Sequence, residues 1–271
     1  MQIVVCVKQV LDPEMPRSAF KIDPEGKRVI PPKGTPPVIS PFDENALEAA
    51  LRIKDHNGAE VIAISMGSML AQAVLRKTLA AGADELILLE DPLFQDIDSF
   101  ASARILASAI RKLGDVDIIF TGRQAADWDS GITGCAIAEE LGIPCITVAR
   151  KVEIADGQVR VERETEGGFE IVQTSLPCVI TADSGLGELR MVTLPGLSAA
   201  RKKPLRVWKA ADLDLPPFPS RSRLLDLYVP KHETVCEVIE GKTPEEAGVK
   251  LADRLHEKGL LQLRGGQGER R

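Results

Sequence analysis

Short apolar runs alternate with longer amphipathic segments along the first half of the chain. The apolar runs show almost no polar alternation, which is typical of parallel strands buried on both faces of a sheet. They are residues 3–7, 60–65, 85–90, 117–121 and 145–150. The segments between them carry apolar residues at helical spacing and are residues 43–58, 68–82, 98–114 and 130–142. This order predicts an α/β protein with an open, doubly wound and mainly parallel sheet.

Local signals mark where the predicted helices begin and end. In the first of them, Asp43 is the expected N-cap, and Glu48 stands four residues before Arg52, which is the spacing of a favourable ion pair. In the second, Ser68 is the expected cap and Gly82 the expected end.

The pattern changes after residue 150. Residues 151–177 alternate between polar and apolar types with a period of two, and Asp156-Gly157 and Gly167-Gly168 lie at turn positions. This predicts a small antiparallel meander. Residues 178–183 are apolar again and are expected to return to the main sheet.

The C-terminal part has a different character. Residues 214–221 are rich in proline and are expected to form an extended arm. Thr243, followed by proline and two glutamates, has the spacing of a helix start and predicts a last helix. We therefore divide the chain into an α/β domain over 1–210 and a C-terminal arm plus helix over 211–271.

The composition of the chain argues against several classes of function. The net charge is −6 and aromatic residues make up 4% of the chain, which argues against nucleic acid or an anionic membrane as a partner. No apolar run approaches the ~20 residues of a membrane span. The five cysteines lack CxxC spacing, four of them look like small buried hydrophobic residues, and the three histidines are isolated. We therefore expect no metal site and a reducing, cytoplasmic location.

The segment GRQAADWDSGITG, residues 122–134, joins a predicted strand to a predicted helix. In a doubly wound sheet the carboxyl ends of the strands form the ligand crevice near the switch point. The helix start offers free N–H groups and the positive end of its dipole, and Gly131 and Gly134 allow close approach. The segment therefore suits a phosphate or pyrophosphate, or it is an ordinary helix start that Asp129 or Ser130 caps.

Other motifs do not indicate catalysis. No arrangement of a nucleophile with a base stands out, so we assign no catalytic residue and no metal ligand. The segment SGLGELR, residues 184–190, has Arg190 in place of the third glycine of a dinucleotide motif. Neither it nor EGKT, residues 240–243, is expected to bind a nucleotide.

The segment MVTLPGLSAARKKPL, residues 191–205, places apolar residues beside a basic run. It is either a short solvated helix after a Pro-Gly turn or a protruding peptide that offers Leu194 or Leu197 to a partner, with a basic rim for steering. The basic run is Arg201, Lys202 and Lys203.

Four motifs, in this order, resemble the β subunit of the electron transfer flavoproteins over nearly the whole chain. VVCVKQV resembles that family's first strand and SPFDENALEAALRIK its following loop and helix. GRQAADWDSGITG resembles its nucleotide loop and LPGLSAARKKPL its partner-recognition loop.

The resemblance implies a heterodimer with an α subunit that carries the working FAD. It implies an electron carrier rather than an enzyme, fed by acyl-CoA dehydrogenase-type flavoproteins, with a quinone oxidoreductase as a further partner. Residues 1–210 would bind the nucleotide, and residues 211–271 would pack on the α subunit. In the recognition loop, Leu194 matches the anchoring leucine. The positions that match the nucleotide site are Cys6, Ser40, Pro41, Phe42, Asp43, Met66, Gly122, Arg123, Gln124, Ala125, Asp127, Asp129, Ser130, Gly131, Ile132 and Thr133.

The positions that match the nucleotide site resemble two different types of family member. Thr133 is the residue of ordinary members, which bind AMP as a structural ligand, whereas Asp43 after Pro-Phe occurs in electron-bifurcating members. We therefore expect AMP. The alternative is a second FAD in this subunit with electrons taken from NADH. A stand-alone adenine-nucleotide-binding protein is a third interpretation, which leaves the recognition-like loop and the arm without a role.

Overall fold

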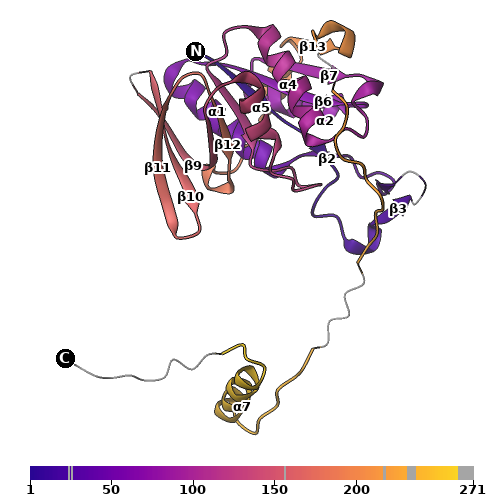
Figure 1. The fold of residues 1–271 in the computed structure, drawn as a ribbon, viewed down its shortest axis with the longest axis vertical. Coiled ribbons are helices and arrows are strands. Elements are labelled where there is room, and N and C mark those ends of the chain that lie inside the picture. The colour runs from indigo at the N-terminus through magenta and orange to yellow at the C-terminus, as the bar shows by residue number, and fades with distance from the viewer. Residues whose placement is uncertain (24, 26, 156, 216–217, 231–235, 262–271) are drawn as a thin grey trace, which may run out of the picture. The chain divides into compact units, whose positions relative to one another are not determined.

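The computed structural model describes residues 1–271 apart from 24, 26, 156, 216–217, 231–235 and 262–271. The chain forms two compact units, Met1–Leu227 and Tyr228–Arg271. Figure 1 shows the first unit as a sheet with helices on both faces.

The first unit contains a nine-stranded sheet in the order β11-β10-β9-β12-β8-β1-β6-β7-β13. Seven of these strands, from β9 to β13 in that order, pair in parallel, whereas β10 pairs antiparallel with both β9 and β11. The strands are β1 (Gln2–Cys6), β6 (Glu60–Gly67), β7 (Glu85–Glu90), β8 (Ile118–Gly122), β9 (Cys145–Ala155), β10 (Gln158–Thr165), β11 (Gly168–Ser175), β12 (Cys178–Ala182) and β13 (Leu205–Trp208).

Two hydrophobic clusters cover the two faces of this sheet. The first packs α1, α3, α6 and one side of the strands, and the second packs α4, α5 and the other side. The helices are α1 (Pro41–Asn57), α2 (Gln72–Leu75), α3 (Lys77–Ala81), α4 (Ser99–Leu113), α5 (Thr133–Leu141) and α6 (Leu194–Ala200). The doubly wound α/β fold is therefore confirmed, and so is the antiparallel meander, which continues the main sheet as β9, β10 and β11. Asp156 of its first predicted turn lies outside the described residues.

The order of the strands places a switch point in the middle of the sheet. From β1 the chain moves in one direction to β6 and β7, and then crosses to the other side of β1 to form β8. The carboxyl ends of β1 and β8 therefore lie side by side while their following segments diverge, which is where α/β proteins form ligand crevices.

The described residues of the long connection between β1 and α1 include four short strands. β2 (Gln9–Val10) pairs with β5 (Val38–Ile39), and β3 (Lys21–Asp23) pairs with β4 (Arg28–Ile30), both antiparallel. The pair of β2 and β5 brings the chain back to the end of β1. There Ser40 N donates a hydrogen bond to Lys8 O at 2.9 Å.

Two predicted helix starts are wrong. Asp43 does not cap α1, because the helix begins at Pro41 and Asp43 lies inside the first turn. The helix expected over 68–82 is interrupted, and α2 begins only at Gln72, so Ser68 caps nothing. The reason is that Leu70 N donates to Glu90 Oε1 and Ala71 N donates to the Gln9 side chain, which holds these amides in a non-helical loop.

Other local predictions are confirmed. Gly82 ends α3, and its N–H donates to Thr78 O at 3.2 Å. Glu48 and Arg52 form the expected ion pair at 3.1 Å. Burial of the cysteines is only partly as expected, because Cys6 and Cys178 are buried while Cys135 is exposed.

The segment after β13 stays with the α/β unit as far as Leu227. Asp98, which caps α4, accepts hydrogen bonds from the backbone N–H groups of Arg221 and Ser222. These contacts explain why the compact unit extends beyond residue 210, the end of the α/β domain proposed from the sequence. Phe218 packs against Phe94 with ring centroids 6.4 Å apart.

The second unit contains one helix, α7 (Pro244–Glu257), among its described residues. Thr243 caps it as expected, since its hydroxyl accepts from Glu246 N at 3.3 Å. The Glu246 carboxylate accepts from Lys242 N at 2.9 Å. No helix among the described residues of the chain is both long enough and apolar enough to span a membrane.

Candidate functional site

Asp43 joins the two strands that flank the switch point. One carboxylate oxygen accepts from Lys8 N, just after β1, at 2.8 Å, and the other accepts from Gly122 N, at the end of β8, at 2.9 Å. The side chain is buried, and burial raises the pKa of Asp43 to about 7, while the two N–H donors act in the opposite direction. The start of α1 is therefore held against the carboxyl ends of both strands.

Gly122 is required at the end of β8 because α1 approaches it closely. A Cβ atom at this position would lie 2.5 Å from Asp43 Oδ1 and 3.0 Å from the carbonyl carbon of Phe42. Any side chain would separate α1 from β8 and break the bond between Asp43 and the Gly122 amide.

The loop after β8 folds back over the strand ends. Ala126 N donates to Ser40 Oγ at 3.3 Å, and Lys8 Nζ binds the Asp127 carboxylate at 2.7 Å. Within the loop, Gln124 Nε2 donates to Asp129 Oδ1 at 3.0 Å and Asp129 N donates to Ala125 O at 3.0 Å. The loop is therefore tied both to itself and to the segment that follows β1.

Two residues of this loop have left-handed backbone conformations. Asp129 has φ +48°, which aspartate tolerates better than most residues, and Gly131 has φ +64°. Both are exposed, as are Trp128 and Ser130 between and beside them. The loop thus presents its backbone to solvent just before α5 begins.

The helix after the loop starts without a side-chain cap. α5 begins at Thr133, and Ile132 occupies the N-cap position with no side-chain hydrogen bond. The alternative interpretation, in which Asp129 or Ser130 caps this helix, is therefore wrong. The Ser130 hydroxyl instead bonds the Ser99 hydroxyl at 3.1 Å. A helix start in this condition leaves N–H groups and the positive dipole end available to an anion.

Gly134 sets how closely α5 packs on the sheet. A Cβ atom there would lie 2.6 Å from Thr121 Oγ1 on β8 and 2.7 Å from Thr181 Cγ2 on β12. The helix start therefore rests directly on the carboxyl ends of these two strands.

Arg123 connects β8 to β12 and to α1. Its backbone N–H donates to Ala182 O at 2.8 Å, and its guanidinium binds the buried carboxylate of Asp183 at 3.1 Å. The guanidinium also lies 4.8 Å from the centre of the Phe42 ring, within the range of a cation–π contact. Asp183 was missed by the sequence interpretation, because a lone aspartate after a strand carries no distinctive signal.

The remaining candidate positions lie at the same edge of the sheet. Cys6 ends β1 and is buried, and burial, together with the Asp43 charge, raises the pKa of its thiol to about 12. Met66 lies near the end of β6 and packs half-buried against the cluster that contains α4 and α5. The structure thus brings the residues of the predicted nucleotide site together from four separate segments.

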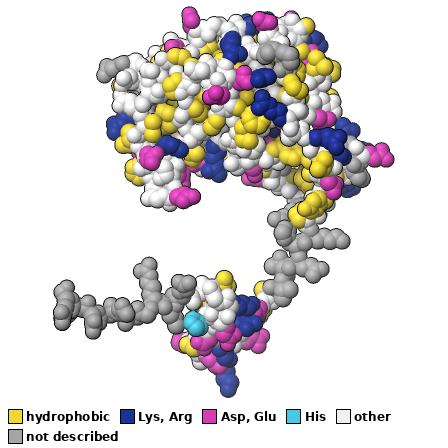
Figure 2. Space-filling model, in the orientation of Figure 1, with side chains coloured by type: hydrophobic (Ala, Val, Ile, Leu, Met, Phe, Trp, Pro, Cys, Tyr) yellow, Lys and Arg dark blue, Asp and Glu magenta, His cyan; other side chains and the backbone are white. Residues whose placement is uncertain are grey.

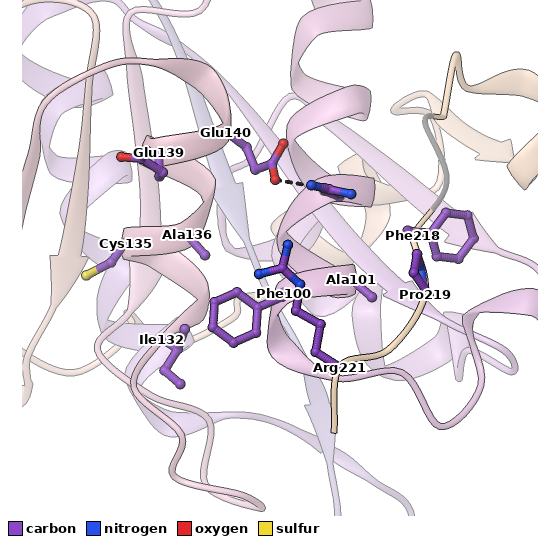
Figure 3. Close-up of a pocket in the computed structure, with 11 residues that line it drawn as sticks. Phe100, Ala101, Ile132, Cys135, Ala136, Glu139, Glu140, Phe218, Pro219 and Arg221 are labelled. Atoms are coloured by element: carbon purple, nitrogen blue, oxygen red, sulfur yellow. Dashed lines mark hydrogen bonds and ion pairs between the residues drawn. The ribbon is translucent and has the colours of Figure 1, made fainter. Parts of the chain in front are cut away.

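A cavity of about 410 Å³ lies between α4, α5 and the segment after β13. Figure 3 shows Phe100 and Arg221 facing each other in it, and the guanidinium of Arg221 lies 5.4 Å from the Phe100 ring centre. Glu140 on α5 binds Arg104 on α4 at 2.8 Å, as the dashed line marks. Ile132 belongs to both the cavity and the loop, so the two features adjoin. No sequence signal pointed to this cavity.

The predicted recognition residues lie on α6 and just after it, and not in the loop of residues 122–133. Leu194 is 83% exposed and Leu197 is 49% exposed. Arg201 and Lys202 are exposed, whereas the Lys203 ammonium donates to Leu79 O at 3.0 Å and to Ala83 O at 2.6 Å. The segment is a short helix, as one of the two interpretations expected, and it also exposes the two leucines.

Charged groups on the visible surface are mixed in sign. Figure 2 shows Lys and Arg side chains interspersed with Asp and Glu on the face of the first unit that it presents. Among the described residues, no group of three or more His, Cys, Asp or Glu side chains is placed to hold a metal ion.

Known proteins are similar to this chain over most of its length. A family model described as the electron transfer flavoprotein domain matches residues 29–213. The caffeyl-CoA reductase-Etf complex subunit CarD of Acetobacterium woodii is 37% identical, over 96% of this chain and 100% of the relative. The electron transfer flavoprotein subunit beta of Thermoanaerobacterium thermosaccharolyticum is 38% identical over the same shares. Protein FixA of Azorhizobium caulinodans is 38% identical, over 78% of this chain and 76% of the relative.

Proposed function

The chain belongs to the electron transfer flavoprotein family as a β-type subunit, and from this we propose that it pairs with an α subunit and holds AMP as a structural ligand. In this proposal electrons travel from a dehydrogenase through the FAD of the α subunit. The subunit carries no catalytic residue of its own and acts as part of an electron carrier. Its five free cysteines suit a reducing, cytoplasmic compartment.

The observation that carries the nucleotide assignment is the loop of residues 122–133 at the switch point. It ends at an uncapped helix start, it bends through two left-handed residues, and it is anchored by Lys8 and Ser40 beneath. Such a start binds phosphate through backbone N–H groups and the helix dipole. AMP is a fitting ligand because its phosphate would use these amides while its adenine lies near Met66.

The residues of this chain would position the nucleotide site and would take no part in a chemical step. Asp43 fixes the relative position of β1, β8 and α1, so the loop is held in one conformation before the nucleotide arrives. Arg123 is already paired with Asp183 and therefore orients the strand end more than it offers a free charge. The FAD of the complex supplies the reversible uptake of electrons.

The dehydrogenase is proposed to dock on α6. Leu194 and Leu197 are large apolar side chains that the fold leaves exposed on one short helix, and such residues are typical anchors of protein interfaces. An acyl-CoA dehydrogenase-type flavoprotein is the proposed electron donor, and a quinone oxidoreductase the proposed acceptor. One relative is a subunit of a caffeyl-CoA reductase-Etf complex, and its name supports a partner that acts on a CoA thioester.

A second FAD in this subunit, reduced by NADH, is the second candidate. Asp43 after Pro-Phe, which the resemblance associates with the bifurcating type, lies in the first turn of α1 and joins β1 to β8. The loop over residues 127–131 is exposed, so it would admit a ligand larger than AMP. Both candidates place a phosphate at the loop of residues 122–133 and the start of α5. They differ in the part of the ligand that extends beyond the phosphate.

One preparation separates them. The chain is co-expressed with its α subunit, the complex is purified and denatured, and FAD and AMP are quantified by chromatography. One FAD and one AMP per heterodimer supports the carrier with a structural nucleotide. Two FAD and no AMP supports the bifurcating type, and NADH should then reduce the complex. Absence of any nucleotide beyond the α-subunit FAD would refute the assignment of the cradle.

Docking is tested separately by Leu194→Ala. The variant should raise the concentration of heterodimer that half-saturates an acyl-CoA dehydrogenase, with nucleotide content unchanged. Unaltered kinetics would remove α6 as the docking site.

A further inference from the structure

A row of polar side chains on α1 holds the chain just before α6. Asn45 Nδ2 donates to Gly187 O at 2.6 Å, and Arg52 donates to Leu186 O at 2.8 Å. Gly187 has φ +94°, and a Cβ atom there would lie 2.7 Å from the Arg52 guanidinium. The segment that leads from β12 to α6 is therefore fitted closely against α1.

The centre of this row is Glu48, which makes three hydrogen bonds to one residue. Its carboxylate accepts from the backbone N, from Nε and from Nη2 of Arg190, at 3.0, 3.0 and 3.1 Å. Arg190 Nη2 also binds Asp55 at 2.9 Å. A bidentate guanidinium combined with a backbone bond leaves neither the side chain nor the main chain of Arg190 free to move.

Glu48 is buried, with 5% of its surface exposed. Burial by itself favours the neutral acid, but the hydrogen bonds from Arg190 and Arg52 outweigh it and hold the pKa of Glu48 below its usual range. The carboxylate is therefore charged and paired at neutral pH. Replacing a whole buried ion pair by apolar residues is often neutral in net stability, whereas in some proteins such a pair selects one conformation.

A second set of contacts holds the other end of the segment. Gly196 on α6 packs so closely on α3 that a Cβ atom would lie 2.5 Å from Ala80 O. Thr193 caps α6 by accepting from Gly196 N at 3.1 Å. After the helix, Lys203 reaches the carbonyls of Leu79 and Ala83.

Between these two anchored ends lie apolar side chains that face solvent. Met191, directly after Arg190, is 91% exposed, and Leu194 is 83% exposed. A short helix with exposed apolar residues would ordinarily fray or fold back. Here the ends are fixed, so the apolar side chains project from a preformed support, which lowers the ordering cost of binding.

We propose that Glu48 is a positioning residue for partner recognition, which acts through Arg190 to hold α6 and its exposed anchors in the geometry that the dehydrogenase binds. The inference rests on the proposed docking role of Leu194 and adds a residue of α1 that does not itself reach the partner. Lys203 belongs to the same support rather than to the steering rim.

The test uses the intact heterodimer and an acyl-CoA dehydrogenase that reduces the wild-type complex. Three variants are compared with the wild type: Glu48→Gln, Leu194→Ala and the double variant. The readouts are the half-saturating concentration of heterodimer, kcat, and FAD and nucleotide content. Glu140→Gln is the matched control, because it weakens a carboxylate–arginine bond on the opposite face of the sheet.

Glu48→Gln should raise the half-saturating concentration roughly 3- to 10-fold, the effect of having to order one or two freed side chains on binding. The value of kcat and the cofactor content should stay at wild-type levels. In the Leu194→Ala background the same substitution should add less than about twofold, because two changes that act through one contact are not additive. Glu140→Gln should leave the half-saturating concentration unchanged.

The outcomes separate this inference from the proposed function. If Leu194→Ala weakens docking and Glu48→Gln does not, Glu48 is no positioning residue, while the docking site stands. If Leu194→Ala has no effect, the docking site itself is wrong. Equal effects of Glu48→Gln with and without Leu194 would also overturn the inference. Should Glu48→Gln fail to fold, Arg190→Lys, which keeps the charge and loses the bidentate bond, is expected to give the same pattern.

Discussion

Replacing Gly134 by alanine should weaken both the fold and nucleotide binding, although alanine is the better helix former. The added Cβ atom would lie 2.6 Å from Thr121 Oγ1 and 2.7 Å from Thr181 Cγ2. Neither threonine turns away without loss, because Thr121 Oγ1 donates to Gly122 O and Thr181 Oγ1 accepts from Val148 N at 2.9 Å. The start of α5 must therefore move away from the sheet.

The size of the effect follows from these distances. Non-bonded carbon contacts are comfortable at about 3.5–4.0 Å, so relief requires a displacement of roughly 1 Å. Overpacking of this kind costs about 1–3 kcal/mol, and helix propensity returns at most about 1 kcal/mol. After a full return from helix propensity, the free energy of unfolding should still fall by up to about 2 kcal/mol. The same displacement moves the α5 amides away from the proposed phosphate position, and each ~1.4 kcal/mol lost there would weaken AMP binding tenfold.

Urea unfolding and AMP titration of the heterodimer, at one fixed concentration, measure the two effects. Gly167→Ala is the matched control, since a Cβ atom at this turn position meets nothing within 4 Å and no left-handed conformation is involved. The control should behave as the wild type. If Gly134→Ala matches the wild type in its urea midpoint and its AMP affinity, then close packing on β8 and β12 does not place this helix start.

Four further substitutions test other parts of the structure. Gly131→Val should strip the bound nucleotide, because φ +64° is strained for a β-branched residue; chromatography of the denatured complex measures it, and full retention would place the phosphate elsewhere. The raised pKa of Asp43 means that its contribution to stability is complete below about pH 4 and is lost as the pH rises through about 7. Asp43→Asn should therefore lower the free energy of unfolding more at pH 5 than at pH 8, and an equal loss at both would contradict the shift. Lys203→Ala should impair docking at low and high salt alike, whereas the effect of Lys202→Ala should vanish at high salt; equal salt dependence would return Lys203 to the steering rim.

The layout of the sheet could be predicted because its signals are local and strong. Apolar runs without alternation, separated by helical periodicity, are enough to indicate parallel strands with helices on both faces. The pairing of β13 with β7 could not be predicted in this way, since Leu205–Trp208 returns from far along the chain and is only partly buried.

Helix starts were less predictable because tertiary contacts override local capping signals. Asp43 looks like a cap, yet its carboxylate is used by Lys8 and Gly122, which are distant in sequence. Ser130 looks like a cap, yet it bonds Ser99. The same explanation holds for Ser68, since the amides of the following loop are taken by Glu90 and Gln9.

The candidate site was predictable as a segment and not as a set of contacts. The glycines and polar residues of 122–134 stand out in the sequence, so this segment could be singled out as a candidate. Asp183, by contrast, becomes interpretable only when β12 is seen beside β8 with Arg123 between them. In the sequence, Arg190 could be interpreted only as the residue that replaces the third glycine of a dinucleotide motif. The structure shows that its guanidinium binds Glu48.

The Asp43 bridge also bears on the order in which this chain can fold. Its two hydrogen bonds span 35 and 79 residues of sequence, and the longer one closes only after β8 has inserted beside β1. Contacts of such long range form late, because the chain must first lose the entropy of the intervening loop. A nascent chain that has released β1, β6 and β7 already holds three paired strands but lacks the second donor of the bridge. The proposed nucleotide site is therefore complete only after β8 has taken its place beside β1 in the central sheet.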